Sequence, residues 1–240
     1  MIKFENTEVL GWGHAIRGMR NPMNSWDKSD SNTSFPCLYP DIGPNDYDLM
    51  KRLRNSGTDH RKFMRMLTVY VDITAPLYWW KEFDTYKVGT VANSCSTMHK
   101  IHAKEFTLDD FSHEHVFNHD TAFDLDCCIE DEEGLDVSPD YILYDTIRML
   151  NKCRERYLVA LKTEDECGIP AKEIWWQMIQ LLPSSYNQKR TVMLNYEVLA
   201  NIYKSRKNHK QDEWSIGFMD WIKRLPYPEL ITGEFDEKEE

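Results

Sequence analysis

Two β-branched, apolar runs each lead directly into a helix-forming segment, and this pattern constrains the fold most. The first run, MLTVYVDI over 66–73, is typical of a strand, and Pro76 then suits the first turn of a helix. The second run, 190–194, ends at Asn195, which favours the N-cap of a helix over 196–205. Between the two runs the apolar periodicity predicts long helices, so the sequence indicates an α+β fold with a mixed sheet.

The rest of the chain is assigned by periodicity and by its turn residues. Further helices are predicted at 46–55, 76–86, 140–161, 170–182 and 211–223. Asn, Asp, Ser and Pro make 1–45 mostly loop, 88–99 is polar and irregular, 109–136 is an acidic, solvated insertion, and the acidic tail 233–240 is expected to fray. Because the chain has 240 residues, no internal repeat and no linker, we expect one domain over 1–240.

The charge balance limits the partners of this protein. Forty acidic residues against twenty-nine basic ones give a net charge of −11, which disfavours nonspecific nucleic-acid binding. Any anionic substrate therefore needs a local basic pocket. No apolar run is long enough for a membrane span and the first residues do not form a signal peptide, so we expect a soluble, cytoplasmic protein without a membrane partner.

Several common kinds of site are disfavoured. The ten glycines form neither GxGxxG nor GxxxxGK[ST]; Gly11-Trp-Gly13 with Gly18 has the wrong interval. None of the six cysteines forms CxxC, which favours reduced, partly buried thiols. The histidine cluster in the acidic segment lacks the helical spacing of HExxH, so we expect a solvated surface and no metal. Its members are His113, His115 and His119.

The stretch from Leu182 to Trp214 is more specific. It reads LPSSYNQKRTVMLNYEVLANIYKSRKNHKQDEW, with Asn195, Asn201 and Arg206 at a strand-to-helix junction and along the following helix. An amide and free helix N–H groups at such a junction suit a phosphate or nucleotide, although capping and surface roles explain the same residues. The order and spacing resemble the C-terminal signature of the flavin-dependent thymidylate synthases, the ThyX family.

A second stretch resembles the N-terminal half of that family. His60-Arg-Lys-Phe63 precedes the first strand, as a His and a Phe do in the family. The family's central motif, RHRxxSxNExSxRY, follows a Gln. Here Glu82 lies under the Gln, Thr85-Tyr86-Lys87 lie under Arg-His-Arg and, with one inserted residue, Asn93, Ser94, Ser96, Met98 and His99 lie under Asn, Glu, Ser, Arg and Tyr.

The departures from the motif remove positive charge. Thr85 and Met98 stand where the family has arginines, whose guanidinium forks suit phosphate oxygens. Glu197 occupies another family arginine position, which reverses the sign of the charge expected near the flavin. Lys87 and Arg206 are then the main cations expected to hold a nucleotide.

The resemblance implies a ThyX-like fold and a reaction. It implies methylation of dUMP to dTMP with FAD, NADPH and methylenetetrahydrofolate, in a homotetramer whose sites lie at subunit interfaces. Arg206 is the implied catalytic residue, which polarises the uracil. The implied cofactor-binding residues are His60, Tyr86, Lys87, Asn93, Asn195 and Asn201, and the implied substrate-binding residues are Glu82, Ser94, Ser96 and Arg206.

Other functions stay open at this point. The chain could be a flavoenzyme that modifies another pyrimidine nucleotide or adds a hydroxymethyl group. The lost arginines favour a ThyX-like scaffold that binds a nucleotide or a partner without catalysis, and a structural protein is a third hypothesis. The aromatic runs 78–80 and 175–176 could stack on a flavin, but tryptophans on amphipathic helices are more often core or interface residues.

Overall fold

The computed structural model of the chain describes residues 2–33, 40–162 and 169–235. The chain forms two compact units that interleave along the sequence. We call the first, Met1–Thr74 with Trp79–Ser94 and Lys189–Glu240, the sheet unit. The second, Ala75–Tyr78 with Cys95–Gln188, is the hairpin unit. The single domain expected over 1–240 stays a prediction.

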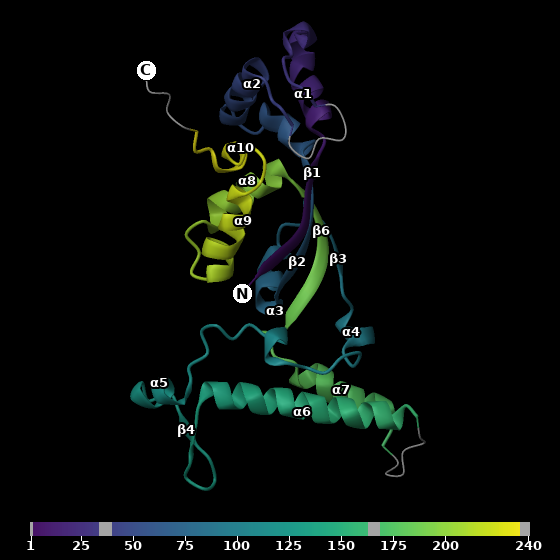
Figure 1. Ribbon diagram of the computed structural model, residues 1–240, viewed down its shortest axis with the longest axis vertical. Helices are drawn as coiled ribbons and strands as arrows, with labels where there is room; N and C mark the ends of the chain where they lie inside the picture. Colours follow the sequence, from purple (N-terminus) through teal and green to yellow (C-terminus); the bar gives the residue numbers. More distant parts are fainter. Residues whose placement is uncertain (1, 34–39, 163–168, 236–240) are drawn as a thin grey trace. The chain divides into compact units, whose positions relative to one another are not determined.

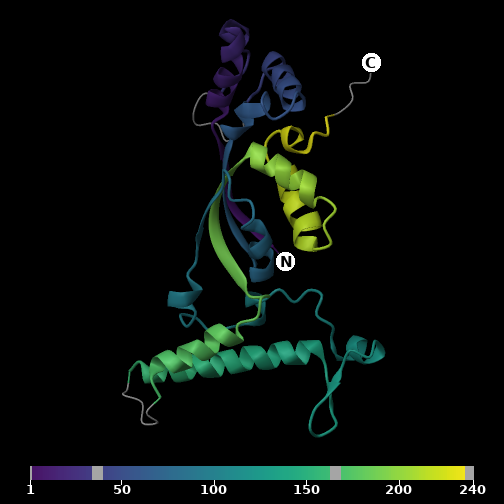
Figure 2. The same cartoon turned by 180° about the vertical axis from the view of Figure 1, so that it is seen from behind.

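A four-stranded sheet forms the centre of the sheet unit (Figures 1 and 2). Its strands lie in the order β1 (Lys3–Leu10), β2 (Thr68–Pro76), β6 (Asn187–Asn195) and β3 (Val91–Ser94). The outer pairs, β1 with β2 and β3 with β6, are antiparallel. Along β2 the side chains of Val69, Val71 and Ile73 are buried, while Tyr70 between them is exposed. This alternation confirms the strand predicted at 66–73 and gives the sheet one apolar face.

Short helices and turns surround this sheet. They are α1 (Trp12–Arg20), η1 (Asn21–Met23), η2 (Trp26–Lys28), α2 (Pro44–Asn55), η3 (Arg61–Arg65), α3 (Leu77–Phe83), α8 (Tyr196–Arg206), η5 (Glu213–Phe218), α9 (Met219–Lys223) and α10 (Glu229–Thr232). Figures 1 and 2 show α8, α9 and α10 together on one face of the sheet. The helices predicted at 46–55 and 196–205 are confirmed as α2 and α8. The segment predicted as one helix over 211–223 begins as a π-helix, η5, and continues as α9.

An aromatic cluster fills the space between α3 and the π-helix η5. Trp79 and Trp214 are fully buried with ring centroids 4.5 Å apart, and Phe218 lies 5.1 Å from Trp214. Phe83 stacks on Trp79 at 5.1 Å, and Trp80 meets Trp79 edge-on at 4.9 Å. Trp79 and Trp80 are therefore core residues, as the amphipathic pattern favoured, and neither is exposed to stack on a ligand.

The prediction that 1–45 is mostly loop is wrong for its first half. β1 and α1 together occupy most of the chain up to Arg20. β1 is an edge strand that bulges between Glu5 and Glu8, where Asn6 takes a positive φ of 51°. The bulge breaks the two-residue alternation, so pairing with β2 defines this strand more than its own sequence does.

Gly11 makes the turn from β1 into α1. Its φ is 97°, and a Cβ at this position would lie 2.1 Å from the carbonyl oxygen of Met66. Only glycine fits this turn without strain. The Gly-Trp-Gly run therefore serves the packing of α1 and does not form a phosphate-binding loop.

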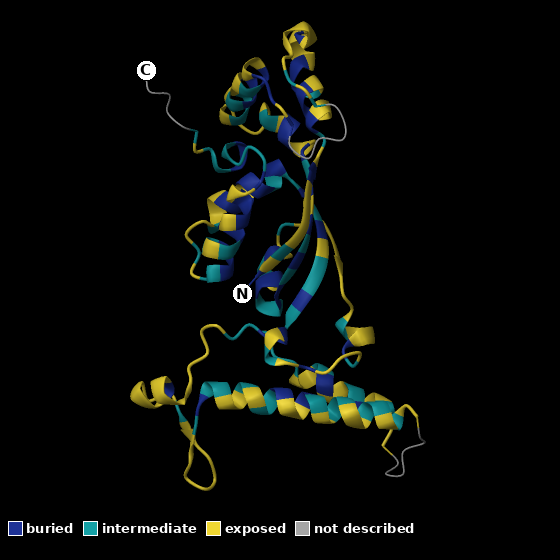
Figure 3. Cartoon of the chain, in the orientation of Figure 1, coloured by how far each residue is buried: buried dark blue, intermediate teal, exposed yellow. Residues whose placement is uncertain are grey.

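Two long helices form the hairpin unit. α6 (Pro139–Ala160) confirms the helix predicted at 140–161, and α7 (Ala171–Leu181) confirms that at 170–182 and runs back along α6 (Figure 1). Their shared core contains Ile101, Phe106, Phe111, Ile147, Leu150 and Met178. Figure 3 shows many exposed residues along α6. Five of the exposed residues of this helix are large and apolar. These are Tyr141, Ile142, Tyr144, Met149 and Val159.

The segments expected to be irregular contain short elements. The stretch 88–99 forms β3 and begins α4 (Thr97–Lys100), because pairing with β6 orders a strand whose four residues are all exposed. The acidic segment 109–136 begins within a turn, η4 (Leu108–Asp110), and contains α5 (His119–Asp124). It ends in a small hairpin of β4 (Ile129–Glu130) and β5 (Asp136–Val137). Most of its residues are exposed. In the tail, 236–240 lie outside the described residues.

Candidate functional site

Arg206 is the last residue of α8 and is held from several sides. Its Nη1 lies 2.5 Å from Glu82 Oε2, and its Nε donates a hydrogen bond of 2.9 Å to the hydroxyl of Tyr86. The guanidinium also lies 5.1 Å from the ring centroid of Trp214. The structure therefore brings together three residues that the sequence predicted as site residues, although two of them lie on the opposite half of the chain.

The guanidinium of Arg206 keeps a donor for a ligand. Its side chain is 18% exposed, so it is neither buried in the core nor free in solvent. Among the residues that the structure describes, Nη2 has no hydrogen-bond partner. A guanidinium fixed by Glu82 and Tyr86, with N–H groups left over, can donate to a carbonyl or phosphate oxygen without reorganising.

His209 joins this cluster and was not predicted from the sequence. Its Nε2 lies 3.4 Å from the Glu82 oxygen that Arg206 contacts. His209 follows α8 by one turn, and its position three residues after Arg206 is the sequence signal that could have found it. We call Glu82, Tyr86, Arg206, His209 and Trp214 the Arg206 cluster.

A second charged group surrounds Glu197 on the first turn of α8. Arg61 Nε lies 3.3 Å from Glu197 Oε1, and Arg65 on the same 3₁₀ helix also pairs with this carboxylate. Arg61 donates a further hydrogen bond of 3.1 Å to the side-chain oxygen of Asn201. Burial acts to raise the pKa of Glu197, but the hydrogen bonds and charges of Arg65 and then Arg61 outweigh it and hold the pKa below its ordinary value.

The expected reversal of charge near the flavin at Glu197 stays a prediction, but the group around this carboxylate is not acidic overall. Two guanidinium groups surround one carboxylate, so the group carries one net positive charge. Lys87 and Arg206 stay the predicted cations for the nucleotide, and the structure adds Arg61 and Arg65 beside Glu197 and the predicted Asn201. Nothing in the local sequence pairs η3 with α8, which is why these arginines were missed.

We predict that Glu197→Gln lowers the free energy of unfolding at pH 7 by about 1–3 kcal/mol, because the buried carboxylate loses its charge and the half-buried Arg61 and the exposed Arg65 lose their ionic partner. A carboxylate whose folded pKa is depressed stabilises the fold above its unfolded pKa, and this contribution disappears as the pH falls through the folded pKa. Urea unfolding should therefore give different free energies of unfolding for the variant and the wild type at pH 7. The two values should become similar below about pH 4. Glu8→Gln, at an exposed position, is the control; an equal effect of both variants would contradict the prediction.

Asn195 has a structural role at the start of α8. Its side-chain oxygen accepts the backbone N–H of Val198 at 3.1 Å, which confirms the predicted N-cap. Gly89 packs directly against the amide: a Cβ on Gly89 would lie 3.1 Å from Asn195 Nδ2. The cofactor-binding role of Asn195 stays a prediction.

The other predicted residues lie outside both groups. His60 and Lys87 are exposed, in the turns before η3 and before β3. Asn93 and Ser94 lie on β3, opposite Thr191 and Arg190. In the part of the chain that the structure describes, the side chains of His60, Lys87, Asn93 and Ser94 have no ionic or side-chain hydrogen-bond partner. Ser96 belongs to the hairpin unit, where its hydroxyl accepts the backbone N–H of His99 at 3.1 Å and caps α4.

Arg190 is a further cation that the sequence did not single out. It extends from β6 beside Ser94, with its guanidinium 4.1 Å from the ring centroid of Trp80 and 2.8 Å from Asp84. The side chain is 15% exposed. Stacking on an indole fixes this guanidinium in place, as an anion-binding arginine needs.

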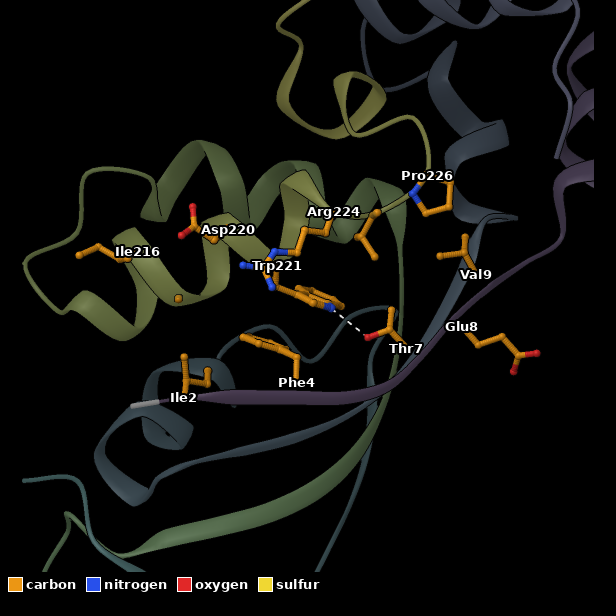
Figure 4. A pocket seen from close by; sticks show the side chains of 12 residues that line it. Ile2, Phe4, Thr7, Glu8, Val9, Ile216, Asp220, Trp221, Arg224 and Pro226 are labelled. Atoms are coloured by element: carbon orange, nitrogen blue, oxygen red, sulfur yellow. Dashed lines mark hydrogen bonds between the residues drawn. The ribbon is translucent and has the colours of Figure 1, made fainter. Parts of the chain in front are cut away.

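A cavity of about 530 Å³ between β1 and α9 contains none of the predicted residues (Figure 4). Phe4 and Trp221 stack in it with ring centroids 4.8 Å apart, and Trp221 Nε1 donates to the hydroxyl of Thr7 at 3.0 Å. It is mainly an apolar contact between strand and helix. Its size alone does not make it the candidate site, because the fixed cations lie elsewhere.

Possible metal ligands, thiols and long helices are further features of the described ranges. No group of three or more His, Cys, Asp or Glu side chains there could hold a metal ion. Cys95 and Cys127 are exposed free thiols, Cys128 and Cys153 are half-buried, and burial raises the pKa of Cys153, which disfavours a reactive thiolate. The remaining two cysteines lie outside the described residues. No helix described there is both long and apolar enough to cross a bilayer.

Comparison with known proteins identifies the fold. No family model and no curated protein matches this sequence. Among solved structures, the chain is similar to thymidylate synthase X (ThyX) from Helicobacter pylori with FAD and dUMP, with a TM-score of 0.61 at 15% identity over 97% of this chain and 98% of that one. A second structure of the flavin-dependent ThyX from Helicobacter pylori, also complexed with FAD and dUMP, gives a TM-score of 0.60 at 15% identity over 95% and 99% of the two chains. The chain has an α+β, ThyX-like fold.

Proposed function

We propose that this protein binds FAD and dUMP and methylates the nucleotide to dTMP, with methylenetetrahydrofolate as carbon donor and NADPH as reductant. The observation that supports this most is the Arg206 cluster, because its guanidinium is fixed by Glu82 and Tyr86 yet keeps free donors. The likeness to ThyX structures that contain FAD and dUMP supports the same pair of ligands. At 15% identity, the activity itself is our proposal.

The residues present fit a uracil ring. Uracil offers carbonyl oxygens, which accept hydrogen bonds, and an N–H group, which donates one. Arg206 supplies donors and Glu82 supplies an acceptor within one cluster. Arg206 would polarise a uracil carbonyl, and the buried Trp214 beneath it would exclude water from that side.

The residues around Glu197 fit a flavin and its phosphates. Arg61 and Arg65 supply two guanidinium groups, and Asn201 supplies an amide, all next to the first three turns of α8. The reduced flavin supplies the hydride in such a reaction, and the protein supplies placement and charge. His60, Lys87, Asn93, Ser94, Ser96 and Asn195 remain proposed ligand contacts.

Assembly into a homotetramer with shared sites is part of this proposal. The exposed apolar residues of α6 support it, because a monomeric protein seldom leaves that many large apolar side chains on one helix in water. Subunits that meet would also bring further cations to a site whose family motif has lost two arginines.

Release of tritium from dUMP labelled at C5 tests the activity. Methylation at C5 replaces this hydrogen, so we expect release that requires FAD, NADPH and methylenetetrahydrofolate together. Omission of each component in turn is the control. Release without flavin, or no release from protein that has bound both flavin and dUMP, would contradict the proposal.

A second candidate function is nucleotide binding without catalysis. It is favoured by Thr85, whose hydroxyl donates a 2.7 Å hydrogen bond to the Glu82 carbonyl and so closes a turn where an arginine was expected. Equilibrium dialysis with dUMP separates this candidate from the first: tight binding of dUMP without tritium release would support it.

A further inference from the structure

A cavity of about 300 Å³ on the sheet unit combines four cationic side chains. Arg54 at the end of α2, Arg61 on η3, and Lys204 and Lys207 at the end of α8 all line it, and among the described residues no acidic side chain does. Two carboxylates contact the lining from outside the cavity: Glu197 pairs with Arg61, and Glu234 accepts the hydroxyl of Tyr203. Such a set of cations is unusual for a protein with a net charge of −11. A concentration of one sign of charge around a small cavity raises the local concentration of an ion of opposite sign.

The two arginines of this cavity are held in place by the fold. Arg54 Nε and Nη2 donate to the backbone carbonyls of Leu230 and Ile231 at 3.2 and 3.1 Å. Arg61 is held by Glu197 and Asn201. Neutral carbonyls hold Arg54 without neutralising it, so its positive charge remains available to an anion.

The positively charged side chains that line the cavity also repel one another. Burial and then the nearby charge of Arg61 lower the pKa of Arg54. Lys204 and Lys207 are three residues apart on α8, so their side chains lie on the same side of the helix. Both lysines are exposed and line the cavity. An anion placed among these four groups would relieve their mutual repulsion.

We propose that this cavity binds the phosphate groups of a phosphorylated ligand. Guanidinium forks match phosphate oxygens, lysines add mobile point charges, and the amide of Asn201 and the hydroxyl of Thr232 complete the lining. The volume holds a diphosphate but is small for a whole dinucleotide. Arg61 and Asn201 also belong to the proposed flavin contacts, so the inference rests in part on the proposed function. Arg54, Lys204 and Lys207 take it further, because they have no part in the Arg206 cluster or in the group around Glu197.

Calorimetric titration of the full chain with inorganic pyrophosphate tests the proposal. We expect one site per chain whose affinity falls as KCl rises, because salt screens the charges. The double variant Lys204→Gln/Lys207→Gln should weaken binding by about tenfold or more, and Lys204→Arg/Lys207→Arg should restore it. The matched control, Lys152→Gln/Lys172→Gln, removes two exposed lysines of the hairpin unit and should bind as the wild type does.

Competition identifies the source of the phosphate. If FAD displaces pyrophosphate while riboflavin does not, the cavity holds the flavin's diphosphate; if both bind together, it holds a separate phosphorylated ligand. Either result supports a phosphate site. No measurable binding of pyrophosphate, or equal affinity in the Lys204→Gln/Lys207→Gln variant and the wild type, would overturn the proposal.

Discussion

Arg206→Ala is expected to reduce tritium release from labelled dUMP by at least about 100-fold, the effect typical of removing one preorganised donor from a reacting carbonyl. The structure gives the physical reason: Glu82 and Tyr86 hold this guanidinium so that its remaining N–H groups need no reorganisation. Arg206→Lys should recover only part of the rate, because an ammonium cannot keep both contacts and still donate to a ligand. Single-turnover rates with saturating nucleotide measure the effect on the chemical step.

The control for this prediction is Arg17→Ala, which removes an exposed arginine of α1. It should leave the rate unchanged. Circular dichroism and bound flavin should be the same in the Arg206→Ala variant as in the wild type, since Glu82 keeps His209 as a partner at 3.4 Å. An unchanged rate in the Arg206→Ala variant would show that the reacting centre lies elsewhere.

Asp46→Ala is expected to lower the free energy of unfolding by about 3–5 kcal/mol, the usual cost of removing one partner of a buried ion pair. Asp46 is fully buried on α2 and lies 2.6 Å from Nε of Arg20, which is itself 4% exposed. The other carboxylate oxygen accepts hydrogen bonds from the hydroxyls of Ser29 and Ser31 at 2.8 and 2.7 Å. Removing the carboxylate leaves Arg20 buried and unpaired, along with these donors.

The matched control for Asp46 lies two residues further along the same helix. Asp48 pairs with Arg52 at 3.0 Å, but both side chains are more than half exposed. Asp48→Ala should therefore lower the free energy of unfolding by at most about 0.5 kcal/mol. Urea unfolding of both variants at pH 7 gives the comparison. Similar losses in the two variants would contradict the account of the buried pair.

The stability that Asp46 contributes should also depend on pH. Burial acts to raise its pKa, but the hydrogen bonds from Ser31, Ser29 and Arg20 and from the Asp30 backbone hold the pKa below its ordinary value. A depressed folded pKa means that the contribution is complete above the unfolded pKa of about 4 and is lost as the pH falls through the folded value. The difference in the free energy of unfolding between the Asp46→Ala variant and the wild type should therefore become smaller only below about pH 4.

Elements with strong local patterns were predicted well from the sequence. The β-branched run that became β2, the periodic helices α6 and α7, and the cap at Asn195 each depend on rules that act within a few residues. β1 and β3 were missed because both are polar edge strands. Pairing with β2 and β6 orders them, and this pairing is not encoded in their own residues.

In the candidate site too, local sequence rules predicted some features, and contacts between distant residues determined the others. Glu82 and Arg206 are separated by 124 residues, so no spacing rule could bring them together; the family resemblance did, and the structure joins them. Arg61 and Arg65 meet Glu197 across more than 130 residues, in a pairing that the resemblance did not contain. The sequence therefore indicated which groups the family would use, and the fold showed which further cations lie beside them.

Visible absorption of the purified protein, before and after addition of FAD, tests the central claim most directly. The account predicts the absorption band of oxidised flavin in protein freed of unbound ligand by gel filtration, either as purified or after incubation with FAD. A protein that stays colourless after this incubation would contradict the proposal that this ThyX-like fold is a flavoprotein.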